Sequence, residues 1–182
     1  MNWKLLLINT SSVLLGFILG SMANMGIIML GGTIIPPPEG ADVTTIDARE
    51  LSSLGRQYGA ILADVPCTGL GALRRRPEVR WRRTVADLKS LVILQAEIID
   101  SAIACLAPGG LLGYATCSPH LSETRIAVSE ALKRHPNMEL VDLTSFIHPE
   151  LRTSAVDRGS LTLWTHRHNT DAMFLSVLRK KN

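Results

Sequence analysis

Apolar positions between residues 58 and 116 recur in two patterns, one typical of buried strands and one typical of an amphipathic helix. A continuous apolar run from Tyr58 to Asp64 predicts a strand that is buried on both faces. Apolar residues then recur every three or four positions from Val85 to Leu106, which predicts a long helix capped by Thr84 and ended by Pro108-Gly109-Gly110. Leu111 to Thr116 predicts the next strand. This order of elements indicates an α/β fold built on a parallel sheet.

The flanking segments predict smaller elements. Val43 to Ile46 is β-branched and predicts a short strand, and Asp47 then caps a short helix from Ala48 to Leu54. The region after residue 120 predicts, in order, a helix that starts at Ser122 and ends at His135-Pro136, an alternating strand from Met138 to Leu143, and a loop from Phe146 to Ser160. Leu161–Trp164 and Ala172–Leu178 then predict a terminal hairpin or paired strands.

The N-terminal segment differs from the rest, because the 34 residues from Leu5 to Pro38 carry no charge. Its length meets the criterion for a membrane helix over residues 5–35, although serine, asparagine and glycine residues dilute the run. A signal peptide, a divergent buried strand and helix, and an unrelated or frame-shifted start are the other interpretations. Pro36-Pro37-Pro38 predicts a boundary between a segment 1–38 and a domain 39–182.

Basic residues gather in one stretch, although the formal net charge of the chain is only +3. Residues 74–83 contain six arginines and one glutamate. Such a cluster suits a polyanion such as RNA, and a solvated basic loop is the alternative. The candidate phosphate-binding residues are Arg74, Arg75, Arg76, Arg80 and Arg82. Trp81 can stack on a base, but we expect it to pack the loop instead.

Three cysteines, an odd number, argue against a disulfide framework and fit a reducing cytoplasm. Cys105 falls inside the helical pattern and is expected to be a small buried side chain. Cys67 and Cys117 each follow a predicted strand. Because ligands of open α/β sheets bind at the carboxyl ends of strands, we expect these two thiols to point into one cleft.

Two motifs around these cysteines resemble those of a known family. Asp64 to Gly71 has the form D-x-P-C-[ST]-G-x-G, and Tyr114 to Ser118 has the form [YS]-x-T-C-S. Together they resemble the RNA (cytosine-5) methyltransferases of the Sun/Fmu type, and the likeness runs from about Ala41 to Lys181. It also includes Asp47-Ala48-Arg49, the run from Arg74 to Trp81, Gln95, Pro108-Gly109-Gly110 and the stretch from His166 to Phe174.

The resemblance implies a Rossmann-like class I methyltransferase fold, here incomplete in its N-terminal half, with a last strand antiparallel to the rest. It implies S-adenosylmethionine as cofactor and ribosomal RNA as partner, methylated at carbon 5 of cytosine through a covalent adduct of a cysteine with carbon 6. By position, Cys117 matches the nucleophile, Cys67 the cysteine linked to product release, and Asp64 a residue near the base and the cofactor's methyl end. Asp47 matches the residue that contacts the cofactor's adenine.

The N-terminal region departs from the family pattern. The glycine-rich loop A-P-G-G-K-T, the acidic ribose ligand and the N-terminal RNA-binding domain are absent. We therefore interpret the chain as the C-terminal catalytic portion of a longer enzyme. An active methyltransferase, an inactive remnant that binds RNA without cofactor, and a membrane-anchored RNA-binding module all stay open. The sequence indicates no metal site, since His166, His168 and Asp171 lack further ligands at suitable spacing, and no protein partner.

Overall fold

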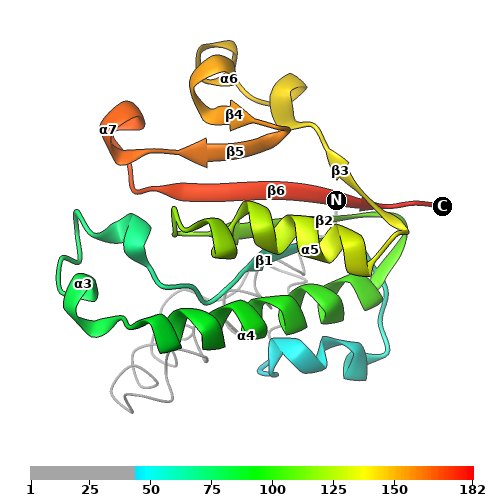
Figure 1. Cartoon of the computed structure of the whole chain (residues 1–182). Helices are drawn as coiled ribbons and strands as arrows, with labels where there is room; N and C mark the ends of the chain where they lie inside the picture. The colour runs from blue at the N-terminus through cyan, green and yellow to red at the C-terminus, as the bar shows by residue number, and fades with distance from the viewer. Residues whose placement is uncertain (1–43) are drawn as a thin grey trace, which may run out of the picture.

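The computed structural model describes residues 44–182, which form a mixed α/β unit (Figure 1). The strands are β1 (Tyr58–Asp64), β2 (Leu106–Thr116), β3 (Met138–Val141), β4 (Val156–Asp157), β5 (Ser160–Leu163) and β6 (Met173–Lys180). The helices are α3 (Val79–Arg82), α4 (Val85–Ala104), α5 (Arg125–Arg134), α6 (Pro149–Ala155) and α7 (Thr165–His168), with short 3-10 helices η1 (Ala48–Leu54), η2 (Leu70–Ala72), η3 (Leu121–Glu123) and η4 (Leu143–Ser145).

All six strands belong to one sheet in the order β1-β2-β6-β5-β4, and β3 also pairs with β6. β1 and β2 are parallel, whereas β6 runs antiparallel to β2, β3 and β5. Strands β3 and β5 both pair with the same edge of β6: β3 lies beside Val177–Lys180, and β5 lies beside Met173–Leu175. The antiparallel last strand agrees with the expectation from the resemblance.

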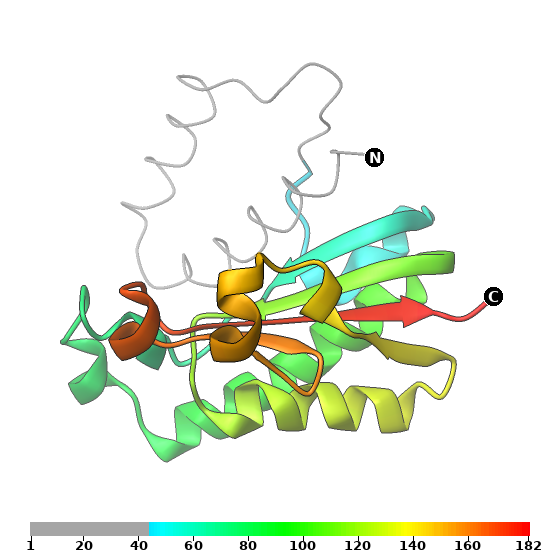
Figure 2. The ribbon, with the colours of Figure 1, turned by 90° about the horizontal axis from the view of Figure 1, so that it is seen from above.

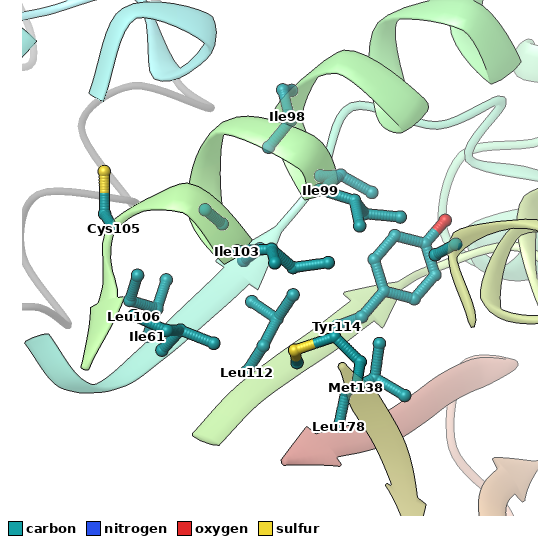
Figure 3. Close-up of a cluster of buried hydrophobic side chains, with 14 of the residues drawn as sticks. Ile61, Ile98, Ile99, Ile103, Cys105, Leu106, Leu112, Tyr114, Met138 and Leu178 are labelled. Atoms are coloured by element: carbon teal, nitrogen blue, oxygen red, sulfur yellow. The ribbon is translucent and has the colours of Figure 1, made fainter. Parts of the chain in front are cut away.

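Helices α4 and α5 cover one face of the sheet (Figures 1 and 2). Thr84 caps α4 as predicted, and it forms a capping box with Asp87: the Thr84 hydroxyl accepts from the Asp87 backbone N–H, and the Asp87 carboxylate accepts from the Thr84 backbone N–H. The core lies between this helix layer and β1, β2 and β6. At its centre Tyr114 packs among aliphatic side chains, and its ring meets Phe174 edge-on at 6.3 Å (Figure 3).

Two boundaries around α4 and β2 differ from the prediction. α4 ends at Ala104 with Cys105 as its C-cap, so Leu106 begins β2 and does not continue the helical apolar face. Pro108-Gly109-Gly110 lies within β2, at an irregularity where the register with β1 shifts, and Gly109 has a φ of 71°. The three residues therefore form a bulge in a strand and do not terminate a helix.

Three other local predictions need correction. Residues 44–46 form neither helix nor strand, although the short helix after Asp47 is present as η1. The helix predicted from Ser122 is split at Thr124 into η3 and α5. The predicted loop from Phe146 to Ser160 contains α6 and β4, which its mixed polar sequence does not indicate.

The apolar run over residues 5–35 and the boundary predicted at Pro36-Pro37-Pro38 both lie outside the described residues. Within residues 44–182, no helix is long and apolar enough to cross a membrane.

Candidate functional site

The two cysteine loops leave the sheet side by side. β1 and β2 are parallel neighbours, and Asp64 at the end of β1 pairs with Ala115 near the end of β2. Cys67 lies three residues beyond Asp64, and Cys117 lies two residues beyond Ala115. The two thiols therefore lie together at the carboxyl ends of the strands, as predicted, because the parallel pairing of β1 with β2 places both loops at one edge of the sheet.

The two sulfur atoms are 3.3 Å apart, within hydrogen-bond distance for thiols. Cys67 is buried, whereas Cys117 is partly open. The hydrogen bond with the Cys67 side chain lowers the pKa of Cys117 below its usual value. The same contact, together with burial, raises the pKa of Cys67. Of the two thiols, Cys117 is therefore the more acidic.

A pocket of about 380 Å³ opens onto this pair. Asp64 and both cysteines line it, and its other walls come from the loop after β1 and from α3. One side of the Asp64 side chain is open to solvent, and burial of the rest raises the pKa of its carboxyl group. The pocket therefore brings together two thiols and a carboxyl group, which belong to the three residues that the motifs singled out.

A buried polar network lies behind the cysteines. The carboxylate of Glu123 accepts hydrogen bonds from Thr68 and Ser118, the residues that follow Cys67 and Cys117. Gln95 of α4 donates to Glu123 at 3.1 Å and to the Pro66 carbonyl at 2.8 Å. The helix that covers the sheet is thereby joined to both loops of the site.

The glycine-rich turn after Cys67 is clamped from two sides at Gly71. Its N–H donates to the Cys117 carbonyl and its carbonyl accepts from the Ala172 N–H, both at 2.9 Å. A Cβ at Gly71 would lie 2.7 Å from the Cys117 carbonyl oxygen and closer still to that of Ala172. Glycine is needed here because the backbones approach too closely for any side chain.

The five predicted phosphate-binding arginines are all exposed but have different surroundings. Arg76 and Arg82 line the pocket, and Arg83 does so as well, which the prediction left out. Arg75 forms an ion pair with Asp171, and Arg74 donates to the side-chain oxygen of Asn169 at 3.2 Å.

Arg80 lies over the ring of Trp81, with its guanidinium carbon 5.3 Å from the ring centroid. The indole of Trp81 is 80% exposed, so the expectation that it packs the loop is wrong. Instead, Trp81 and Arg80 present an aromatic and cationic surface to solvent beside the pocket.

Asp47 lies apart from the residues that line the pocket. It caps η1 by accepting from the Arg49 N–H at 2.9 Å, and it forms an ion pair with the Arg49 side chain at 2.6 Å. These hydrogen bonds lower the pKa of Asp47. Its carboxylate is thus ionised and held by a neighbour on the same short helix.

Sequence reasoning missed Glu123, whose position at the start of a predicted helix is typical of an exposed residue. Its only signal was its spacing, six residues after Cys117. His168 has a structural role, since its Nδ1 accepts from the Trp164 N–H at 2.8 Å. Among the described residues, no group of three or more His, Cys, Asp or Glu side chains is arranged to hold a metal ion.

Comparison with known sequences identifies relatives over most of the chain. The model of the family described as 16S rRNA methyltransferase RsmB/F matches residues 37–179. A putative methyltransferase of Mycobacterium tuberculosis is 45% identical over 157 residues, covering 80% of this chain and 34% of that protein. A probable ribosomal RNA small subunit methyltransferase B of Synechocystis is 36% identical over 121 residues, covering 65% of this chain and 26% of that protein. The chain thus spans about a third or less of these relatives.

Solved structures give the same result. The NSun6 protein of Pyrococcus horikoshii, solved with SFG, is 27% identical and superposes with a TM-score of 0.72 over 89% of this chain and 40% of that one. A methyltransferase homologue from the same organism, 23% identical, superposes with a TM-score of 0.66 over 88% of this chain and 51% of that one. These likenesses confirm the Rossmann-like methyltransferase fold. The chain belongs to the RsmB/F (Sun/Fmu) family of 16S rRNA methyltransferases.

Proposed function

We propose that this chain carries the catalytic cysteines of an S-adenosylmethionine-dependent enzyme that methylates carbon 5 of cytosine in ribosomal RNA. The observation that carries the proposal is the pair of thiols, 3.3 Å apart at the ends of two parallel strands, one with a lowered and one with a raised pKa. Family membership supports RNA as the substrate class.

The chemistry needs a nucleophile because carbon 5 of cytosine attacks electrophiles poorly. The Cys117 thiolate forms a bond to carbon 6, and the electrons of the 5,6 double bond make carbon 5 nucleophilic. After methylation, a base takes the proton of carbon 5, the electron pair of that C–H bond re-forms the 5,6 double bond, and the bond between Cys117 and carbon 6 breaks to return Cys117 as a thiolate. We assign this release to Cys67, which lies in hydrogen-bond contact with Cys117.

Asp64 supplies the electrostatic part of the mechanism. Its carboxyl group lines the same pocket as both thiols, and burial raises its pKa above the usual value. A carboxyl group in this position can hydrogen-bond the N3 and N4 edge of cytosine and stabilise the charge that develops as the adduct forms.

S-adenosylmethionine, when bound, supplies an electrophilic methyl group on a sulfonium centre. Asp64 fits a residue at the methyl end, since its carboxyl group opens into the pocket. Asp47 would hold the adenine, and this requires its ion pair with Arg49 to exchange for a contact to the base. SFG, an analogue of this cofactor, accompanies the NSun6 structure and supports the assignment.

RNA would reach the pocket past the arginine-rich loop. Arg74, Arg75, Arg76, Arg80 and Arg82 are exposed along the loop and α3, and a target cytosine must leave its stack to meet a partly buried thiolate. Exposed Trp81 offers a stacking surface beside this path. Free thiols with these roles need a reducing compartment, so we place the protein in the cytoplasm.

Methyl transfer from labelled cofactor to ribosomal RNA tests the proposal with three variants of the chain. Cys117→Ala should abolish transfer, and Cys67→Ala should leave RNA covalently attached to the protein, visible as a slowly migrating band on a denaturing gel. Cys105→Ala is the matched control and should behave as the parent chain. Transfer that survives Cys117→Ala would refute the proposal.

A second outcome separates the enzyme from an inactive remnant. If the chain binds RNA but calorimetry detects no binding of S-adenosylmethionine, the missing glycine-rich loop has removed the cofactor site and the cysteines serve no reaction here. Cofactor binding that is lost in Asp47→Ala would instead support an active site that is complete in this chain.

A further inference from the structure

Glu123 is a carboxyl group with no access to solvent. Its exposed fraction is 0%, and it ends η3, between the Cys117 loop and α5. Taking a carboxylate out of water is strongly unfavourable unless hydrogen bonds replace those to water. A fully buried glutamate beside the pocket therefore indicates a role that the fold alone does not require.

Each oxygen of Glu123 has two donors. Oε1 accepts from the Thr68 N–H at 2.8 Å and from Gln95 Nε2 at 3.1 Å. Oε2 accepts from the Thr68 hydroxyl at 2.5 Å and from the Ser118 hydroxyl at 2.6 Å. Four hydrogen bonds match the acceptor capacity of a carboxylate, so the side chain is fixed in one orientation.

Three of these four donors belong to the two cysteine loops, and the fourth, Gln95, belongs to α4. Thr68 is bonded directly to Cys67 in the chain, and Ser118 is bonded directly to Cys117. The Tyr114 hydroxyl donates to the Glu123 backbone carbonyl at 2.8 Å, which anchors the segment from the core side. The Glu123 carboxylate thus links Thr68 to Ser118, and each of these two residues is the chain neighbour of one cysteine.

We infer that Glu123 is a positioning residue for the cysteine pair: by holding Thr68 and Ser118 together, it fixes the distance between the sulfur atoms of Cys67 and Cys117. The inference rests on the proposed function for its meaning in catalysis. Its physical content, the geometry of two thiols, is independent of RNA and cofactor. The Thr68 contacts set the position of the Cys67 thiol, and the Ser118 contact sets that of the Cys117 thiol.

Charge and position have opposite effects on Cys117, and this makes the inference testable. The hydrogen bond from Cys67 lowers the pKa of Cys117, whereas the negative charge of Glu123 raises it. If Glu123 acted only through its charge, an uncharged replacement would make Cys117 more acidic. If it acts through position, the replacement loosens the contact with Cys67 and makes Cys117 less acidic.

The experiment measures the rate of Cys117 alkylation by iodoacetamide in the purified 182-residue chain between pH 5 and pH 10. Peptide mass mapping separates Cys117 from the other two cysteines. In Glu123→Gln the profile should move to higher pH. A rise of one pKa unit cuts the thiolate fraction about tenfold but raises its intrinsic reactivity about threefold, so the rate near pH 7 should fall about threefold.

Other charged groups that face Cys117 stay constant across these variants. They are Asp64 from β1, Glu78 at the start of α3, and the arginines of the loop and α3 around the pocket, Arg75, Arg76, Arg82 and Arg83. Glu130→Gln, the same substitution on the exposed side of α5, is the matched control and should leave the profile unchanged.

Thr68→Val provides a second test if Glu123→Gln does not fold. It removes one hydroxyl donor but keeps the Thr68 N–H bond to Glu123, and it should shift the profile in the same direction by a smaller amount. Thr68→Ser keeps the hydroxyl and should restore the parent profile. Circular dichroism establishes that each variant is folded.

Two results would overturn the inference. In a folded Glu123→Gln protein, a profile that moves to lower pH would show that charge is the whole effect, and an unchanged profile would show that the link has no influence on the thiols. Absence of methyl transfer in the parent chain, with the alkylation shift still present, would instead reject the proposed function and leave the positioning role intact.

Discussion

The guanidinium group of Arg75 forms an ion pair with the carboxylate of Asp171, which joins the loop after β1 to the segment that precedes β6. The side chain of Asp171 is 10% exposed, and that of Arg75 is 66% exposed. The two residues are 96 positions apart in the sequence. The pair therefore ties the arginine-rich loop to the segment that leads into β6, the central strand of the sheet.

This pair makes part of the stability depend on pH. Arg75 lowers the pKa of Asp171 below its usual 3.8, so its contribution is complete above that value and is lost as the pH falls through the lowered pKa. Asp171→Asn should therefore lower the melting temperature at pH 7 by a few degrees, and the difference from the parent chain should close in strong acid.

Thermal melting monitored by circular dichroism across the acid range checks this expectation. Arg75→Ala should lower the melting temperature of the parent chain but should add little in the Asp171→Asn background, because the partner is already neutral. Equal losses in both backgrounds would mean that the two side chains do not act as a pair.

Gly71→Ala should lower the free energy of unfolding by about 1–3 kcal/mol or more, the usual cost of forcing an extra carbon into a closed space. The new Cβ would be 2.7 Å from the Cys117 carbonyl oxygen. Gly59→Ala is the control, since no atom lies within 4 Å of a Cβ at that position. Urea unfolding of both variants gives the comparison, and similar free energies of unfolding would contradict the clamp at Gly71.

Mild oxidation should join Cys67 to Cys117. Hydrogen peroxide would take one hydrogen from each thiol, form the bond between the sulfur atoms and leave as two molecules of water. The sulfurs are 3.3 Å apart and need to move about 1.3 Å to reach bonding distance. The number of titratable thiols in the unfolded chain should fall from three to one, leaving buried Cys105.

Matched cysteine variants locate the new bond. Oxidised Cys67→Ala should keep both of its remaining thiols under conditions that remove two from the parent chain. A disulfide that includes Cys105 would show that the thiols move far more than this geometry allows.

Asp64→Asn should have opposite effects on two reactions of Cys117. The hydrogen bond from Cys67 lowers the pKa of Cys117, and the negative charge of Asp64 opposes that effect, so its removal should make Cys117 more acidic and speed its alkylation at neutral pH. Methyl transfer to RNA should fall by about 10²-fold or more, because stabilisation of the developing charge is lost. Parallel assays of Cys117 alkylation and of methyl transfer check both effects. A change of the two rates in the same direction would contradict the proposed role of Asp64.

The sequence was sufficient to place the thiols because its strongest signals were local. The apolar run that ends at Asp64 and the one that ends at Thr116 both predicted strands, and parallel pairing brings their ends together. The capping residues Thr84 and Asp47 were predicted correctly for the same reason, since a cap depends on neighbours within a few positions.

The remaining features depend on contacts that sequence patterns do not encode. Glu123 is buried because donors from three separate elements meet there, and nothing adjacent to it in the chain indicates this. Leu106 fits the apolar spacing of the helix, but α4 has already ended at its C-cap, Cys105, and Leu106 is the first residue of β2. Trp81 has an apolar ring, yet it is 80% exposed with Arg80 over the ring, and a local sequence pattern does not reveal this exposure.

The central position of β6 has a consequence for the order in which the chain folds. Leu112 of β2 pairs with Ile61 on one side and with Leu178 on the other, so the middle of the sheet joins residues 117 positions apart. Contacts of such long range form slowly, because a large loop must close before they stabilise anything. Until β6 docks, the Ala172 backbone cannot reach Gly71, and the turn that carries Cys67 has no clamp. The cysteine pocket is therefore among the last parts of the molecule to take shape.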